Sequence, residues 1–295
     1  MLNAKNNSQS IRRAKFAGSW YPKDKYVLED LIEQAFSALE EQSPPSTCAV
    51  LPHAGISFSA LGMAAFFQNL PPQTERLVLL GPSHTTSLDP DRLVGGNFTG
   101  YATPFGNVDG FSLSSVVRGF DQAIEREHAV EMILPFIAYM NKSREKQISY
   151  SPALISKVTN GFVLAELCDR LVSDIGRKSL KSGETVLVAS SDFTHYGSRF
   201  GYTPYSRLSL GAQKERVRED DLVLARLLAA GKSEGALALY NEKKPTICGI
   251  APSVIISEIA RRLGLAGSIA SYYSSYDIAP SSGDSFVAYC TILWS

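Results

Sequence analysis

The chain has 295 residues, of which 44% are hydrophobic and 20% are charged, and Lys+Arg 29 balances Asp+Glu 29. This composition is ordinary for a globular protein and supplies enough apolar material for a sizeable core. A net charge of zero argues against a broad surface for nucleic acid or anionic membranes, because both rely on clustered positive charge. No apolar run approaches the length needed to span a bilayer.

The N-terminal residues and the cysteines predict a reduced, cytoplasmic protein. The first fifteen residues are polar and basic and lack the apolar centre of a signal peptide, so residues 1–15 are expected to form a flexible tail. The four cysteines are widely spaced and include no C-x-x-C pair, unlike a disulfide framework or a structural zinc knuckle. They are Cys48, Cys168, Cys248 and Cys290.

The predicted elements alternate between helices and strands for most of the chain. Apolar residues at three- and four-residue spacing predict helices at 23–42, 58–69, 127–136, 160–178, 211–230, 233–242 and 251–264. Apolar or alternating runs predict strands at 48–51, 77–80, 147–156, 186–189, 268–276 and 285–294, with irregular loops and a short strand pair in 85–110. We therefore expect one α/β domain over residues 16–295, built as a three-layer sandwich around a central mixed sheet.

Three of the four histidines follow apolar runs of the kind that form buried strands. Ligands in open α/β sheets bind just past the carboxyl ends of such strands. These histidines are His53, His84 and His195, and Asp192 lies near His195. The pattern predicts one pocket built at the ends of three strands.

The residue types in this pocket indicate metal binding and proton transfer. Imidazole is the commonest protein ligand for transition metals, and the matched settings of His53 and His84 favour a metal site over two structural histidines. Cys248 precedes Gly249 at a predicted helix start, where a thiolate would be stabilised, but a small buried hydrophobe fits equally well. Asp192 could orient His195 as a general acid or base, or could cap a short helix.

Other motifs are absent or incomplete. His128 lies between Glu127 and Glu131, but a single histidine does not make the H-E-x-x-H zinc motif, so it is expected behind the ligands or on a helix surface. The chain contains no G-x-G-x-x-G, no G-x-x-x-x-G-K-[ST] and no G-x-S-x-G. Nucleotide binding and the serine-hydrolase elbow therefore have no support.

Several motifs, in this order, resemble the Memo family (mediator of cell motility), which is related in fold to the LigB-type class III extradiol dioxygenases. They are 17–21 (AGSWY), 52–55 (PHAG), 80–84 (LGPSH), 103–104 (TP), 127–128 (EH), 131–132 (EM), 134–135 (LP), 190–193 (SSDF) with His195, and 246–249 (TICG). They are spread over almost the whole chain, and the resemblance implies a LigB-like α/β domain with one deep pocket.

The resemblance also implies a ligand set. The dioxygenases hold a non-haem Fe(II) with two histidines and a glutamate. The histidines correspond to His53 and His84, and the third position in the Memo family is a cysteine, here Cys248. A thiolate shifts the preference of the site, so Fe(II) or Cu is expected, with Zn also compatible. His195 resembles the histidine that moves protons, beside Asp192, and the expected pocket wall is formed by His128, Trp20 and Ser83.

Three functions remain open on the sequence. The first is a metal-dependent, dioxygenase-like oxidoreductase or metal-handling protein that takes an unknown small molecule. The second is a binding module that recognises a peptide or partner protein through the same pocket. The resemblance implies radical-SAM and AMMECR-type proteins as partners and associates animal Memo proteins with phosphorylated receptor peptides. The third is a hydrolase with Cys248 as nucleophile and His195 as base.

Overall fold

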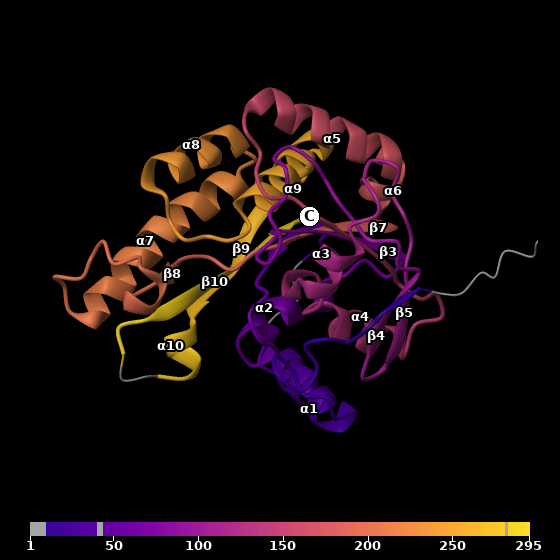
Figure 1. The fold of residues 1–295 in the computed structure, drawn as a ribbon, viewed down its shortest axis with the longest axis horizontal. Helices are drawn as coiled ribbons and strands as arrows, with labels where there is room; N and C mark the ends of the chain where they lie inside the picture. The colour runs from indigo at the N-terminus through magenta and orange to yellow at the C-terminus, as the bar shows by residue number, and fades with distance from the viewer. Residues whose placement is uncertain (1–9, 40–43, 281–282) are drawn as a thin grey trace, which may run out of the picture.

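The centre of the protein is a seven-stranded mixed sheet with the order β6-β3-β7-β2-β10-β8, in which β9 also pairs with β10 (Figure 1). In this computed structural model, residues 10–39, 44–280 and 283–295 are described. The strands β6, β3, β7 and β2 are parallel, and β10 is antiparallel to β2, β8 and β9. The strands are β2 (Cys48–Leu51), β3 (Arg76–Gly81), β6 (Ser149–Leu154), β7 (Thr185–Ser190), β8 (His195–Tyr196), β9 (Gly267–Ser274) and β10 (Phe286–Trp294). The predicted α/β class with a mixed sheet is confirmed.

Helices pack on both faces of this sheet, so the molecule has two cores. Cys48 and Val50 of β2 face one core, with α5, α7 and α9, whereas Ala49 and Leu51 face the other, with α1, α2 and α4. Figure 1 shows α5 and α9 on one side of the strands and α1 and α2 on the other. The helices are α1 (Lys25–Ser37), α2 (Ile56–Gln68), α3 (Asp121–Arg126), α4 (Leu134–Asn141), α5 (Gly161–Ile175), α6 (Arg177–Ser182), α7 (Leu210–Ala229), α8 (Ser233–Lys243), α9 (Ile250–Leu263) and α10 (Ser275–Ile278).

The central parallel strands are covered on both faces, which explains their uninterrupted apolar sequences. All residues of β2 and β7 are buried. Their registers align Leu51 with Ser190, and Leu80 of β3 with Ala189. The carboxyl ends of three strands therefore meet at one edge, as the sequence predicted. None of the helices described here is both long and apolar enough to cross a membrane.

Two local predictions differ from the structure at a proline or a glycine, and a third, the strand predicted at 147–156, is confirmed as β6 despite Pro152. The predicted helix 127–136 is divided between a 3₁₀ turn, His128–Val130, and α4, where Pro135 occupies the first turn and lacks only an N–H that needs no helical partner. Pro152 lies in β6, an edge strand, where a sheet tolerates proline. The predicted helix 160–178 ends before Gly176, whose φ of 94° separates α5 from α6.

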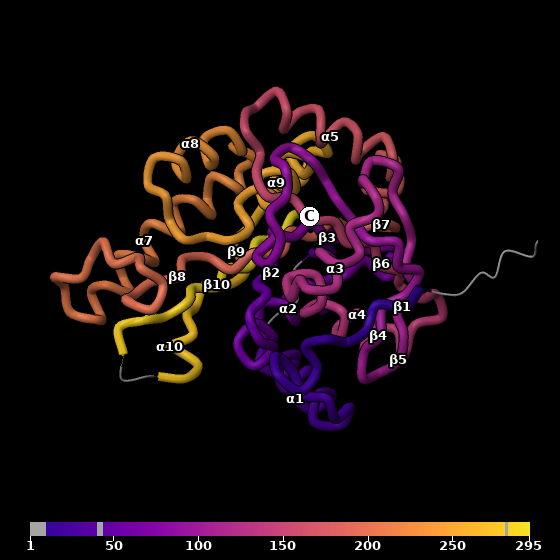
Figure 2. The backbone as a smooth tube through the Cα atoms, viewed as in Figure 1, coloured from indigo at the N-terminus to yellow at the C-terminus, as the bar shows by residue number. Residues whose placement is uncertain are grey.

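The chain is ordered earlier than predicted at its N-terminus. Residues 1–9 of the expected tail lie outside the described residues, but Ile11–Arg12 form a strand, β1, so the tail does not extend to residue 15. This strand pairs with β4 (Gly100–Thr103), which pairs with β5 (Gly106–Asp109) in a small separate sheet (Figure 2). The sequence around this strand is mainly polar and does not have the pattern of a strand. The strand is stabilised by its pairing with β4, which is distant in the sequence.

Arg12 and Glu131 form a fully buried ion pair that fixes the N-terminal segment to the body. The Arg12 guanidinium also donates to the carbonyl oxygens of Ile124 at 3.0 Å and Glu127 at 3.1 Å. The Glu131 carboxylate accepts hydrogen bonds from Phe16 N at 2.8 Å and from the Tyr21 hydroxyl at 2.7 Å. A buried ion pair is favourable only when such additional hydrogen bonds satisfy both charges.

We predict that Arg12→Met lowers the free energy of unfolding by about 3–5 kcal/mol, because Glu131 would remain buried without its cation. The measurement is urea denaturation followed by circular dichroism. The control is Arg170→Met, which removes the exposed Arg170–Glu166 pair and should change stability little. Equal losses in the two variants would contradict a special role for the buried pair.

Candidate functional site

Asp192 joins two of the strand ends on which the site is built. Its Oδ1 accepts hydrogen bonds from the backbone N–H groups of His53 at 2.8 Å and Ala54 at 3.2 Å. The residues after it are not helical, so the alternative role as a helix cap does not apply. Burial raises the pKa of Asp192 even though His195 and the two N–H groups oppose this. The carboxyl group therefore holds the first turn after β2 against the end of β7.

Three imidazoles lie together at the edge of the sheet. His53, His84 and His128 each present a ring nitrogen, and these atoms lie within 4.8 Å of one another. The ring of His128 stacks on that of His84, with 4.5 Å between centroids, and His53 is edge-on to both at 5.2 Å. His53 is buried, whereas the His84 side chain keeps 30% of its exposure. Solvent therefore reaches the imidazole cluster on the side of His84.

Glu127 orients two of these rings. Its buried carboxylate accepts hydrogen bonds from Nδ1 of His84 at 2.8 Å and from the His84 backbone N–H at 2.6 Å, and it lies 3.2 Å from Nδ1 of His128. Burial would raise the pKa of Glu127, but the hydrogen bonds that it accepts from His84 outweigh burial and lower the pKa. An ionised Glu127 retains the proton on Nδ1 of each ring, which leaves both Nε2 atoms free as acceptors or ligands.

Ser190 sets the third imidazole in the same way. Its hydroxyl donates to the Ala129 carbonyl at 2.7 Å and lies 2.8 Å from Nδ1 of His53. Because the hydroxyl proton is already used, Ser190 must accept from Nδ1–H of His53. In the neutral His53 ring the lone pair therefore lies on Nε2, as it does in His84 and His128.

Cys248 approaches the same His53 nitrogen from another side. Its Sγ lies 3.2 Å from His53 Nε2 and 3.5 Å from the Asp192 carbonyl oxygen. His53, Asp192 and Cys248 form a second group of donor atoms within 4.8 Å. The thiol precedes Gly249, the N-cap of α9, but burial raises its pKa well above the ordinary value. Desolvation thus overrides the expected stabilisation of a thiolate by the helix.

His195 lies on β8 and is fixed by backbone groups. Its Nδ1 donates to the carbonyl oxygens of Thr246 at 3.0 Å and Phe193 at 3.1 Å, which leaves Nε2 free. Among the described residues, its side chain forms no hydrogen bond with Asp192 or Cys248. The Cys248 thiol contacts the His53 imidazole. This arrangement does not favour a hydrolase that uses His195 as the base.

The residues expected in the pocket wall have different environments. The Trp20 ring packs against His128 with 4.3 Å between centroids, and Trp20 is 37% exposed, so it lies at the solvent side of the imidazole cluster. Its carbonyl oxygen accepts the N–H of Ile56 at the start of α2, at 2.9 Å. Ser83 instead donates its hydroxyl to the Thr86 carbonyl within its own turn, at 2.7 Å.

Sequence reasoning missed the roles of Glu127 and Ser190. Glu127 is next to His128 in the chain, but its main hydrogen bond is to His84, 43 residues away. Ser190 follows an apolar run directly, as polar residues at strand ends often do, and nothing in the sequence pairs it with His53. The sequence shows only that Glu127 and Ser190 lie in or next to histidine-containing motifs. It does not show which histidine each of them contacts.

Comparisons with known proteins agree over almost the whole chain. A family model described as "Memo-like protein" matches residues 12–293. The chain is 29% identical to a MEMO1 family protein of Pyrococcus furiosus, over 96% of this chain and 98% of that protein. It is 27% identical to the protein memo-1 homolog of Caenorhabditis elegans, over 96% of this chain and 82% of that protein.

We predict that acid destabilises this cluster in the metal-free protein. Burial and neighbouring His84 lower the pKa of His128 to about 4, whereas an unfolded histidine titrates near 6.5. Below pH 6.5 the unfolded chain therefore binds a proton that the folded chain does not. His128 should contribute a loss of about 2 kcal/mol in stability between pH 7 and pH 5.

The measurement is urea denaturation of the wild type and His128→Gln at pH 7 and pH 5. The variant should lose about 2 kcal/mol less than the wild type over this range. A control variant, His84→Gln, identifies any general effect of removing an imidazole from the cluster. Equal losses in the wild type and His128→Gln would contradict the neutral state assigned to His128.

Proposed function

The chain belongs to the Memo family, and on this premise we propose that its pocket binds a transition-metal ion. The observation that carries the proposal is the position of His53, which belongs to two groups of possible ligand atoms. One group consists of the imidazoles of His53, His84 and His128. The other adds Asp192 and the thiol of Cys248 to His53. The ligand set expected from the sequence, His53, His84 and Cys248, takes members from both.

The chemistry of the donors supports a metal ion over an organic cation. In the neutral imidazoles the proton lies on Nδ1, where Glu127 and Ser190 accept it, so each Nε2 keeps its lone pair for a ligand. Carboxylate-oriented imidazole is the usual arrangement behind metal-ligating histidines. Nitrogen and sulfur donors together suit Fe(II), Cu or Zn rather than Mg or Ca. Binding through Cys248 would release the thiol proton to solvent.

We further propose a redox or metal-handling role for this site, of the LigB dioxygenase-like kind. A bound Fe or Cu ion would supply electron-transfer and Lewis-acid chemistry. The chain itself would contribute the free Nε2 of His195 for proton transfer to or from a small molecule, and Trp20 at the rim for contact with it. Asp192 would act by holding the His53 turn in place.

The exposed ring of Trp20 favours a second candidate, in which the same pocket recognises a peptide or partner protein without turnover. An aromatic side chain that is partly exposed at a pocket rim is typical of binding surfaces. This candidate does not require His53 and Cys248 to retain a metal, so the first experiment distinguishes the two.

We predict near-stoichiometric binding of Co(II), used as a spectroscopic probe, to protein purified without oxygen or chelator. Visible and near-ultraviolet absorption would report nitrogen and thiolate ligation. His53→Ala should abolish binding, and Cys248→Ala should remove the thiolate charge-transfer band. Cys168→Ala removes a thiol outside the pocket and should leave the spectrum unchanged. Wild-type protein that binds no Co(II), Cu(I) or Fe(II) would instead favour the binding module.

We also predict that Glu127→Gln lowers the affinity for the ion by about 10- to 100-fold, because the amide cannot hold the Nδ1 protons of His84 and His128 as the carboxylate does. Competition with a chelator of known affinity would measure the change. Glu125→Gln, an exposed residue in the same segment, provides the matched control. Similar affinities for both variants would contradict the orienting role.

A further inference from the structure

Another buried acid, Asp221, lies on α7, outside the candidate site. It is 1% exposed, and its Oδ1 accepts a hydrogen bond from the Thr194 hydroxyl at 2.6 Å. Its Oδ2 accepts from the Tyr272 hydroxyl at 2.9 Å and lies 3.4 Å from the Thr194 backbone N. No ion pair to Asp221 occurs among the salt bridges of the described residues, and Lys243 pairs with Asp220 instead.

Thr194 connects this carboxyl group to the residues of the site. It is the neighbour of His195, and its carbonyl accepts the N–H of Ala288 on β10 at 2.9 Å. His195 in turn donates its backbone N–H to the Thr246 hydroxyl at 3.0 Å, two residues before Cys248. Asp221 therefore bonds the residue that directly precedes His195, mainly through the Thr194 hydroxyl.

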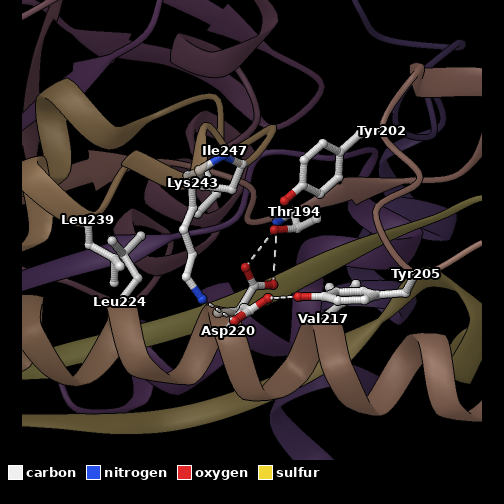
Figure 3. Close-up of a pocket in the computed structure, with 11 residues that line it drawn as sticks. Thr194, Tyr202, Tyr205, Val217, Asp220, Leu224, Leu239, Lys243 and Ile247 are labelled. Carbon is white, nitrogen blue, oxygen red and sulfur yellow. Dashed lines mark hydrogen bonds and ion pairs between the residues drawn. The ribbon is translucent and has the colours of Figure 1, made fainter. Parts of the chain in front are cut away.

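A small cavity lies beside these segments. Figure 3 shows Thr194 directed toward the acidic side chains of α7, with Tyr205 and Lys243 bonded to Asp220 beside it. The cavity has a volume of about 20 Å³, enough for about one water molecule. Its lining includes Thr194 and Ile247, so it reaches both chain segments that carry His195 and Cys248.

We propose that Asp221 is a positioning residue for His195, and that the hydrogen bond to Thr194 transmits its charge state to the site. The ionised carboxylate accepts from the Thr194 hydroxyl and N–H and from Tyr272. The protonated acid must use one oxygen as a donor, so at least one of these bonds weakens or reverses. The turn that precedes His195 then loses part of its anchor.

The charge state of Asp221 changes near neutrality. Burial raises its pKa to about 7, although the hydrogen bonds from Thr194 and Tyr272 oppose the shift. The titratable and charged groups that face it are Asp220 on its own helix, Tyr202 and Tyr205 in the preceding loop, Lys243 from α8, Tyr272 on β9 with Arg218 near it, and Cys290 on β10. The Asp220 pKa is lowered, and those of the tyrosines and Cys290 are raised.

The role of His195 in proton transfer rests on the proposed function. The position of its backbone does not depend on a bound metal, so the test uses metal-free protein. The Thr194 methyl group and the backbone amide of position 195 are followed by NMR from pH 5.5 to 8.5. The wild type and Asp220→Asn should show an inflection near pH 7 in both signals, and Asp221→Asn should lose it. His195→Gln should keep it, which separates the carboxyl group from the titration of the imidazole.

Asp221→Asn should also gain stability relative to the wild type as the pH rises from 5 to 8, because the wild type alone must then ionise a buried acid. If Asp221→Asn does not fold, Thr194→Val removes the hydroxyl and keeps the acid, and it should abolish the inflection at position 195. An inflection retained in Asp221→Asn, or in Thr194→Val when the first variant is unfolded, would overturn the proposal.

Discussion

Desolvation at the carboxyl ends of β2, β3 and β7 is the constraint on which the rest of the site depends. The strands are buried on both faces, so polar groups placed just past their ends are largely removed from water. A buried polar atom without a partner costs several kcal/mol by transfer estimates. Each such group therefore has a specific partner, and these partners fix the orientation of the imidazoles.

Segments distant in the sequence supply those partners. The residues that orient His53 and His84 are Ser190 and Glu127, and the segment that carries Glu127 is itself held by Arg12. Arg12 comes from β1, outside the main sheet, and its ion pair with Glu131 also fixes the chain that leads to Trp20. The N-terminal segment thus covers one side of the imidazole cluster, where Phe16 and Trp20 pack against His128.

The electrostatic consequence is a pocket that favours neutral donors. Burial lowers the pKa values of His53 and His128 and raises those of Asp192 and Cys248. Burial thus favours the neutral form of all four groups, the two bases and the two acids alike. A divalent cation reverses this preference, because its charge repays the cost of an ionised thiol and uses the neutral imidazoles as they stand. The same desolvation acts on Asp221, whose pKa is raised by burial.

The sequence by itself determined the α/β class, the mixed sheet of alternating elements and the placement of His53, His84 and Asp192 just past buried strands. Apolar periodicity and strand ends are local patterns, and a fully buried strand has to be apolar throughout. Only the tertiary structure decided that His128 joins the imidazoles, that Glu127 serves His84, that Arg12 is a core residue and that Asp221 supports Thr194. These contacts join residues from 27 to 119 positions apart. Their energies come from burial, and burial is a property of the assembled fold.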